Sequence, residues 1–70
     1  MIPLSMVNTG ETGLIKRITG NENTKHFLEN LGFTEGSNVT VVSEIGGNII
    51  VKIKESRVAI DKSMASRIYI

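Results

Sequence analysis

One stretch of the sequence, Lys25 to Val42, leaves this chain few ways to fold. It joins a short amphipathic pattern to two glycines and then to alternating valines, with no residues to spare for a flexible connection. Gly32 stands where a helix would end in the left-handed conformation, which glycine adopts without strain. Gly36 falls in the turn that follows. We therefore expect a helix, a tight connection and a strand in direct succession.

The helix is predicted over Thr24–Leu31, with Asn21 or Asn23 as its N-cap. Its apolar residues recur at helical spacing and are expected to face the core: Phe27, Leu28 and Leu31. Its polar residues are expected to face water: Lys25, Glu29 and Asn30. A helix of about eight residues is marginal in isolation, so packing must hold it in place.

The rest of the chain reads as short strands separated by turns. The expected strands are Pro3–Ser5, Thr12–Ile18, Asn38–Ser43, Ile49–Lys54, Arg57–Ile60 and Arg67–Ile70. Turns are expected at Asn8–Gly10, Gly46–Asn48 and Glu55–Ser56, and Asp61 is expected to cap a helical turn over Lys62–Ser66. In Thr12–Ile18 the phase is ambiguous, because Ile15 falls on the face opposite Leu14 and Ile18 unless a bulge intervenes.

These elements predict a mainly β fold in which a strongly bent antiparallel sheet closes into a small barrel. Closure would remove unpaired sheet edges, which promote aggregation in a chain rich in Val and Ile. No linker or internal repeat divides the sequence, so we expect one domain over residues 1–70. A core of this size typically supplies a net stability of roughly 3–5 kcal/mol.

The composition excludes several classes of function. The chain has no cysteine, which rules out disulfides and thiol chemistry. Its net charge of +1 and its three aromatic residues argue against nucleic-acid binding. No apolar run reaches the roughly 20 residues needed to span a bilayer, and no signal peptide is evident. No catalytic constellation is apparent, so the protein is expected to be a cytoplasmic monomer without enzymatic activity.

Two groups of polar residues can be explained either as ordinary solvated surface or as a functional site. His26 lies at helical spacing from Glu22 and Glu29, so the three could hold a divalent transition metal weakly, although a solvated helix face is the favoured explanation. No other cofactor is expected. Five basic residues could gather on one barrel face and meet phosphate or an acidic partner, or could form a solvated outer face: Lys16, Arg17, Lys52, Lys54 and Arg57.

Two apolar residues fall in segments that usually run over the surface. Phe33 follows the helix end and Ile45 precedes the hairpin turn. Exposed together, they would mark a contact patch. The alternative for Phe33 is that it folds back and covers the open end of the barrel.

The spacing of glycines and aliphatic residues resembles the ferrous iron transport protein A (FeoA) family along nearly the whole chain. The matching positions are Gly10, Gly13, Leu28, Leu31, Gly32, Gly36, Val39 and Ala59. These look like fold-forming positions. Two departures are Gly46–Asn48, where relatives often have a proline and an acidic residue, and Asp61, where they tend to be basic.

The resemblance implies an SH3-like barrel that acts beside ferrous iron transport protein B (FeoB), a membrane transporter with a cytosolic G-domain. The expected role is to bind the cytosolic region of that transporter at the inner face of the membrane and to support or modulate its activity. The expected contact residues are Lys25, Glu29, Asn30, Phe33 and Ile45. A metal-sensing module around His26 and a small RNA-binding barrel are the alternatives.

Overall fold

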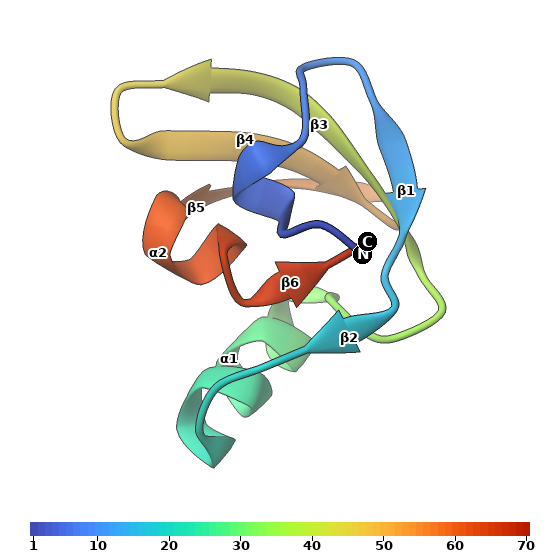
Figure 1. The fold of residues 1–70 in the computed structure, drawn as a ribbon, viewed down its shortest axis with the longest axis vertical. Helices are drawn as coiled ribbons and strands as arrows, with labels where there is room; N and C mark the ends of the chain where they lie inside the picture. Colours follow the sequence, from blue (N-terminus) through green and yellow to red (C-terminus); the bar gives the residue numbers. More distant parts are fainter.

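The computed structural model describes residues 1–70 and shows a mainly β chain with one principal helix, as predicted (Figure 1). The elements follow in the order η1 Leu4–Met6, β1 Thr12–Leu14, β2 Arg17–Ile18, α1 Glu22–Leu31, β3 Asn38–Ile45, β4 Asn48–Ile53, β5 Ser56–Asp61, α2 Lys62–Ala65 and β6 Ile68–Tyr69. Neither α-helix is long and apolar enough to cross a membrane.

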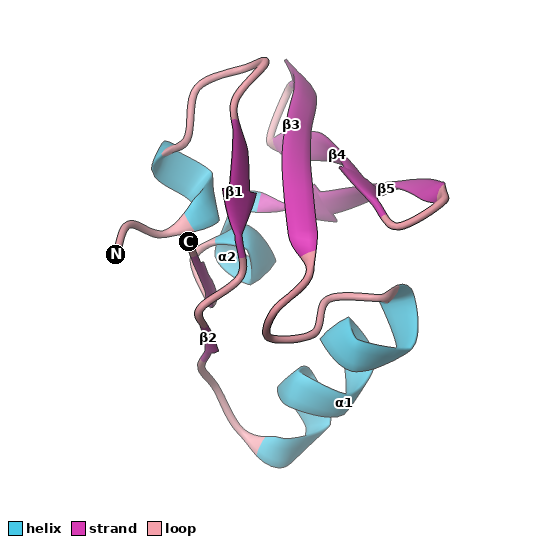
Figure 2. Cartoon of the chain, turned by 90° about the vertical axis from the view of Figure 1, so that its right-hand side faces the viewer, coloured by secondary structure: helices cyan, strands magenta, loops and turns pink.

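The strands form two antiparallel sheets. The larger has the order β1-β3-β4-β5, and the smaller pairs β2 with β6. Figures 1 and 2 show the larger sheet bending around η1, α2 and the small sheet, with α1 at the lower end of the molecule. The two chain ends meet, because Ile2 and Ile70 exchange two backbone hydrogen bonds of 2.9 Å each.

The segment predicted as one strand over Thr12–Ile18 is two strands in different sheets. β1 pairs with β3, and β2 pairs with β6. Between them, the backbone N–H of Ile15 donates to Ser37 and that of Lys16 donates to Tyr69. This break resolves the ambiguous phase, because it turns Ile15 into the core while leaving Leu14 exposed.

The predicted first strand over Pro3–Ser5 is wrong. Leu4–Met6 instead forms a single 3-10 turn, η1, and only Pro3 makes an isolated bridge to Tyr69. The turn directs Leu4 into the core, where it is fully buried. A straight strand over Pro3–Ser5 would extend beyond its pairing with Tyr69, but the partner strand there, β6, is only two residues long.

The hairpin from β3 to β4 matches the sequence pattern closely. Its two-residue loop is Gly46–Gly47. β4 buries Ile49, Val51 and Ile53, while on its other face Asn48 and Lys52 are exposed and Ile50 is half-buried. A register shift between Val41 and Ser43 marks a bulge in β3. The following turn lies at Lys54–Glu55, one residue earlier than predicted, with Lys54 at a φ of 55°.

Capping side chains fix both α-helices. The Asn21 side chain accepts a hydrogen bond of 2.9 Å from the backbone N–H of Thr24, so α1 begins at Glu22 rather than at Thr24. Gly32 ends α1 with a φ of 108°, as predicted. Asp61 caps α2 by accepting a hydrogen bond of 2.8 Å from Met64 N–H.

All of these elements contribute to one core cluster. Its twelve buried side chains are Leu4, Ile15, Leu28, Phe33, Val39, Val41, Ile49, Val51, Ile53, Ile60, Ala65 and Ile68. No polar or charged residue is buried. The interior is therefore purely apolar, and its role is structural.

Gly13→Ala is expected to lower the free energy of unfolding by about 1–3 kcal/mol. A Cβ at this position would lie 2.3 Å from Ile70 Cδ1 and 3.0 Å from Ile70 Cβ and Cγ1. Gly47→Ala is the matched control, since no atom lies within 4 Å of its new methyl group. Urea unfolding should separate the two variants, and equal stabilities would contradict the packing of Ile70 on Gly13.

Candidate partner-binding surface

Helix α1 packs fewer apolar side chains against the core than its sequence predicts. Leu28 is fully buried, and Thr24 and Leu31 are partly buried, at a spacing of four and then three residues. Phe27 lies about 100° around the helix from Leu28 and is 49% exposed. The prediction that Phe27 faces the core is therefore wrong, because a helix that centres Leu28 on the core carries Phe27 to its flank.

Phe33 is the aromatic residue that the core takes instead. It is fully buried, and its backbone N–H donates to Leu28 at 3.0 Å. The left-handed turn at Gly32 reverses the chain and directs Phe33 inward behind the helix. The expectation that Phe33 forms part of a contact surface is corrected, and its alternative, in which Phe33 folds back over the core, is what the structure shows.

A surface cavity of about 330 Å³ lies beside α1. It is lined by Lys25 and Glu29 from the helix, Ile18 from β2, and Thr34 and Glu35 from the connection to β3. The structure thus brings together two of the predicted contact residues. Asn30 is exposed on the same helix, so three of the five predicted contact residues share this end of the molecule.

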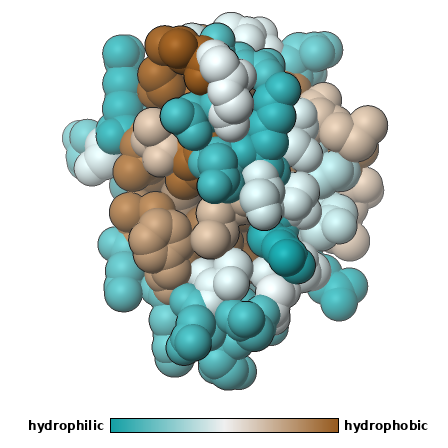
Figure 3. All heavy atoms as spheres, turned by 90° about the vertical axis from the view of Figure 1, so that its left-hand side faces the viewer, coloured by the Kyte–Doolittle hydropathy of each residue, from teal (hydrophilic) through white to brown (hydrophobic).

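Ile45 does not belong to that group. It is the last residue of β3 and is 64% exposed. In Figures 1 and 2 this end of β3 is at the top of the molecule, whereas α1 is at the bottom. Figure 3 shows apolar atoms on the upper and middle parts of one side, above a hydrophilic lower end. The predicted contact residues therefore do not form one continuous patch.

The structure also brings together part of the predicted metal set. His26 Nε2 lies 3.8 Å from Glu22 Oε2 on the solvent side of α1. No group of three or more His, Cys, Asp or Glu side chains is positioned to hold a metal ion, so Glu29 does not complete the set. One imidazole and one carboxylate fall short of the donors that a stable site needs. These residues do not fit a resident metal.

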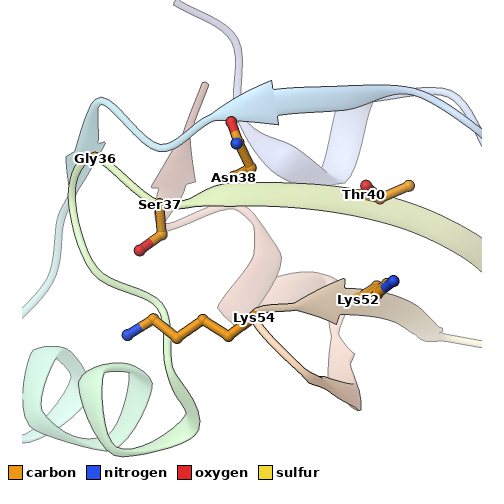
Figure 4. A pocket seen from close by; sticks show the side chains of 6 residues that line it. All are labelled: Gly36, Ser37, Asn38, Thr40, Lys52 and Lys54. Carbon is orange, nitrogen blue, oxygen red and sulfur yellow. The ribbon is translucent and has the colours of Figure 1, made fainter.

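A polar trough lies on the outer face of the larger sheet (Figure 4). The trough, defined by the residues that line it, has a volume of about 470 Å³ and consists of Gly36, Ser37, Asn38, Thr40, Lys52 and Lys54. Of the five basic residues singled out in the sequence, it gathers Lys52 and Lys54, and Arg57 lies opposite Lys52 on β5. Lys16 and Arg17 belong to the β2 segment. The sequence signal for this feature was the alternation of Lys52 and Lys54 with apolar residues, although β4 ends before Lys54.

The exchange of roles between the two phenylalanines can be tested by unfolding. Phe33→Ala is expected to cost about 3–5 kcal/mol, because it leaves a cavity in the core. This is comparable to the whole stability expected of such a domain. Phe27→Ala is the control and should change the stability by less than about 1 kcal/mol. Circular dichroism in urea measures both, and a larger loss for Phe27→Ala would contradict this arrangement.

Comparisons with known proteins agree with this architecture. Residues 2–70 match the family model described as the FeoA domain. A protein of Methanocaldococcus jannaschii named "Putative Fe(2+) transport protein A" is 29% identical over 70 residues, which is 100% of this chain and 85% of the relative.

Solved structures show the same fold. The crystal structure of an iron uptake regulatory protein (FeoA) has a TM-score of 0.88 and 33% identity, over 96% of this chain and 89% of that one. The zinc complex of Stenotrophomonas maltophilia FeoA, described as an SH3 domain protein, has a TM-score of 0.86 and 23% identity, over 99% and 88% of the two chains. A manganese-dependent transcriptional repressor has a TM-score of 0.86 and 25% identity over 94% of this chain but only 38% of its own. The predicted SH3-like barrel is confirmed, and the match over residues 2–70 shows that this chain belongs to the FeoA family.

Proposed function

We propose that this protein is an accessory component of ferrous iron uptake that binds the cytosolic region of a FeoB-type transporter and supports or modulates its activity. The observation that carries the proposal is the FeoA match over residues 2–70, together with a full-length relative named for Fe(2+) transport. The protein would act as a monomer in the cytoplasm, at the inner face of the membrane where its partner lies.

The end of the molecule that carries α1 is the contact surface that the geometry favours. Phe27 offers a half-exposed aromatic ring, and aromatic residues dominate the energetics of protein interfaces. Asn30, three residues further on, is exposed on the same side of the helix as Phe27. Lys25 and Glu29 are each two residues from Phe27, so they lie on the opposite flank, where they line a cavity that a partner side chain can enter. We name these four residues, Lys25, Phe27, Glu29 and Asn30, the α1 surface.

The size of the molecule limits how many such surfaces one partner can cover. Its accessible surface is 4268 Å², and its longest dimension is 28 Å. A standard interface buries about 800 Å² on each partner, which is about a fifth of this total. One partner domain can therefore cover the α1 surface and its immediate surroundings without reaching Ile45 at the opposite end.

Phe27→Ser and Ile45→Ser form a matched pair that tests this assignment. Each removes one exposed apolar side chain from one end of the molecule. Phe27→Ser is expected to weaken binding to the purified cytosolic region of a FeoB-type transporter by about tenfold, which corresponds to about 1.4 kcal/mol. Ile45→Ser should leave the affinity within about twofold. Calorimetry measures both constants.

The reverse pattern, with the loss confined to Ile45→Ser, would overturn the α1 surface. Absence of any binding by the unaltered protein would overturn the proposed function itself.

The metal-sensing alternative starts from the pair formed by His26 and Glu22. Because two donors make a poor site, micromolar Fe²⁺ or Mn²⁺ under anaerobic conditions is expected to broaden the His26 resonances no more than those of other exposed residues. His26→Gln is the control. Selective, saturable broadening that disappears in His26→Gln would favour a metal-sensing role over the accessory role without metal.

A further inference from the structure

We propose that the polar trough on the outer face of the larger sheet binds an acidic peptide segment whose carboxylates meet Lys52 and Lys54. This inference rests on the proposed function, because it names the chemistry of the partner segment. The trough lies outside the α1 surface and is built from strands β3 and β4, the turn before β3 and the turn after β4.

The trough belongs to a polar row that crosses the whole sheet. Thr12 on β1 pairs with Thr40 on β3, Thr40 pairs with Lys52 on β4, and Lys52 pairs with Arg57 on β5. The hydroxyls of Thr12 and Thr40 lie 2.7 Å apart. The outer face therefore changes from hydroxyl groups at β1 to cations at β4 and β5, and no carboxylate lines the trough between them.

The cations of this face have no partner within the molecule. The chain contains two ion pairs, Glu22 with His26 and Glu44 with Lys62, and neither involves Lys52, Lys54 or Arg57. Lys52 and Arg57 stand directly opposite each other, an arrangement of like charges that destabilises a sheet. These exposed cations are therefore free to pair with an external anion.

The placement of the lysines indicates the form of that anion. Lys52 lies on β4, whereas Lys54 lies in the turn directly after it with a φ of 55°, and both line the trough. Figure 4 shows Lys54 reaching along the end of the sheet toward α1, while Lys52 lies further along β4. A single small anion does not reach along both positions. A peptide that carries several carboxylates can pair with both lysines at once.

The shape of the trough favours a peptide over a single phosphate group. Its volume of about 470 Å³ is that of roughly fifteen water molecules, which exceeds what one phosphate fills. No arginine lines it to offer a bidentate fork, and no helix begins there. Its remaining groups are hydroxyls and an amide, from Ser37, Thr40 and Asn38, which suit hydrogen bonds along a peptide.

The trough reaches the C-terminal end of α1. A Cβ built on Gly32, at the end of α1, would lie 3.9 Å from Lys54 Cδ. A partner that covers the α1 surface therefore needs only a short acidic segment to reach the lysines. The sheet edge plays no part, because β3 and β4 are each paired on both sides.

The test is a titration of the ¹⁵N-labelled protein, without any transporter, with a synthetic peptide of about twelve residues that alternates Glu with Thr. Amide shifts are expected at Ser37, Thr40, Lys52 and Lys54, and binding should weaken with salt. The double variant Lys52→Gln and Lys54→Gln should lose about tenfold in affinity. The control Lys62→Gln and Arg67→Gln removes the same charge around α2 and should lose less than about twofold.

Equal losses of affinity in the two double variants would overturn the proposal, because they would show that binding depends only on the net charge of the protein. So would displacement of the peptide by an equal concentration of inorganic phosphate, or tighter binding of an oligouridylate of the same charge. A peptide that alternates Gln with Thr should not bind. Because the titration contains no transporter, its failure leaves the proposed accessory function standing, while loss of transporter binding would leave the peptide result unchanged.

Discussion

The burial of twelve apolar side chains in one cluster is the interaction on which every other feature of this protein depends. The chain has no cysteine and no buried polar group, so packing alone joins its elements. Leu28 and Phe33 attach α1 to the sheet, while Ile15 and Ile68 attach the small sheet at the other side of the same cluster. This packing also explains the irregular points of the backbone. The break after Leu14, the turn at Gly32 and the 3-10 turn at Leu4 each direct one side chain into the cluster.

Features that depend on neighbouring residues were predictable from the sequence. The end of α1 at Gly32, the cap at Asp61 and the alternating burial of β4 each follow from a few adjacent positions. Features that depend on which distant part of the chain packs against a side chain were not predictable in this way. Phe27 and Phe33 are both apolar and six residues apart, and only the docking of α1 through Leu28 decides that the second is buried. The division of Thr12–Ile18 likewise requires β6, which lies at the far end of the chain.

The same packing decides which surfaces remain for recognition. Because no polar group is buried, recognition depends on the outer surface, where Lys54 of the trough lies close to Gly32 at the end of α1. Glu29 and Asn30 face water as predicted, whereas Lys25 is half-buried beside the cavity at α1. The sequence also indicated Lys52 and Lys54 as outward basic residues. It could not join them, because their proximity arises from the tight connection between α1 and β3. Ile45 remains a separate feature at the other end of the molecule.

We propose that the α1 surface and the trough both contact the cytosolic region of a FeoB-type transporter. The most direct test is a map of amide chemical-shift changes on the ¹⁵N-labelled protein as that cytosolic region is added. We expect the changes to gather at residues 25–30, 37–40 and 52–54 and to leave the hairpin at residues 45–48 unaffected. Changes confined to the hairpin, or none at saturating partner, would contradict the account.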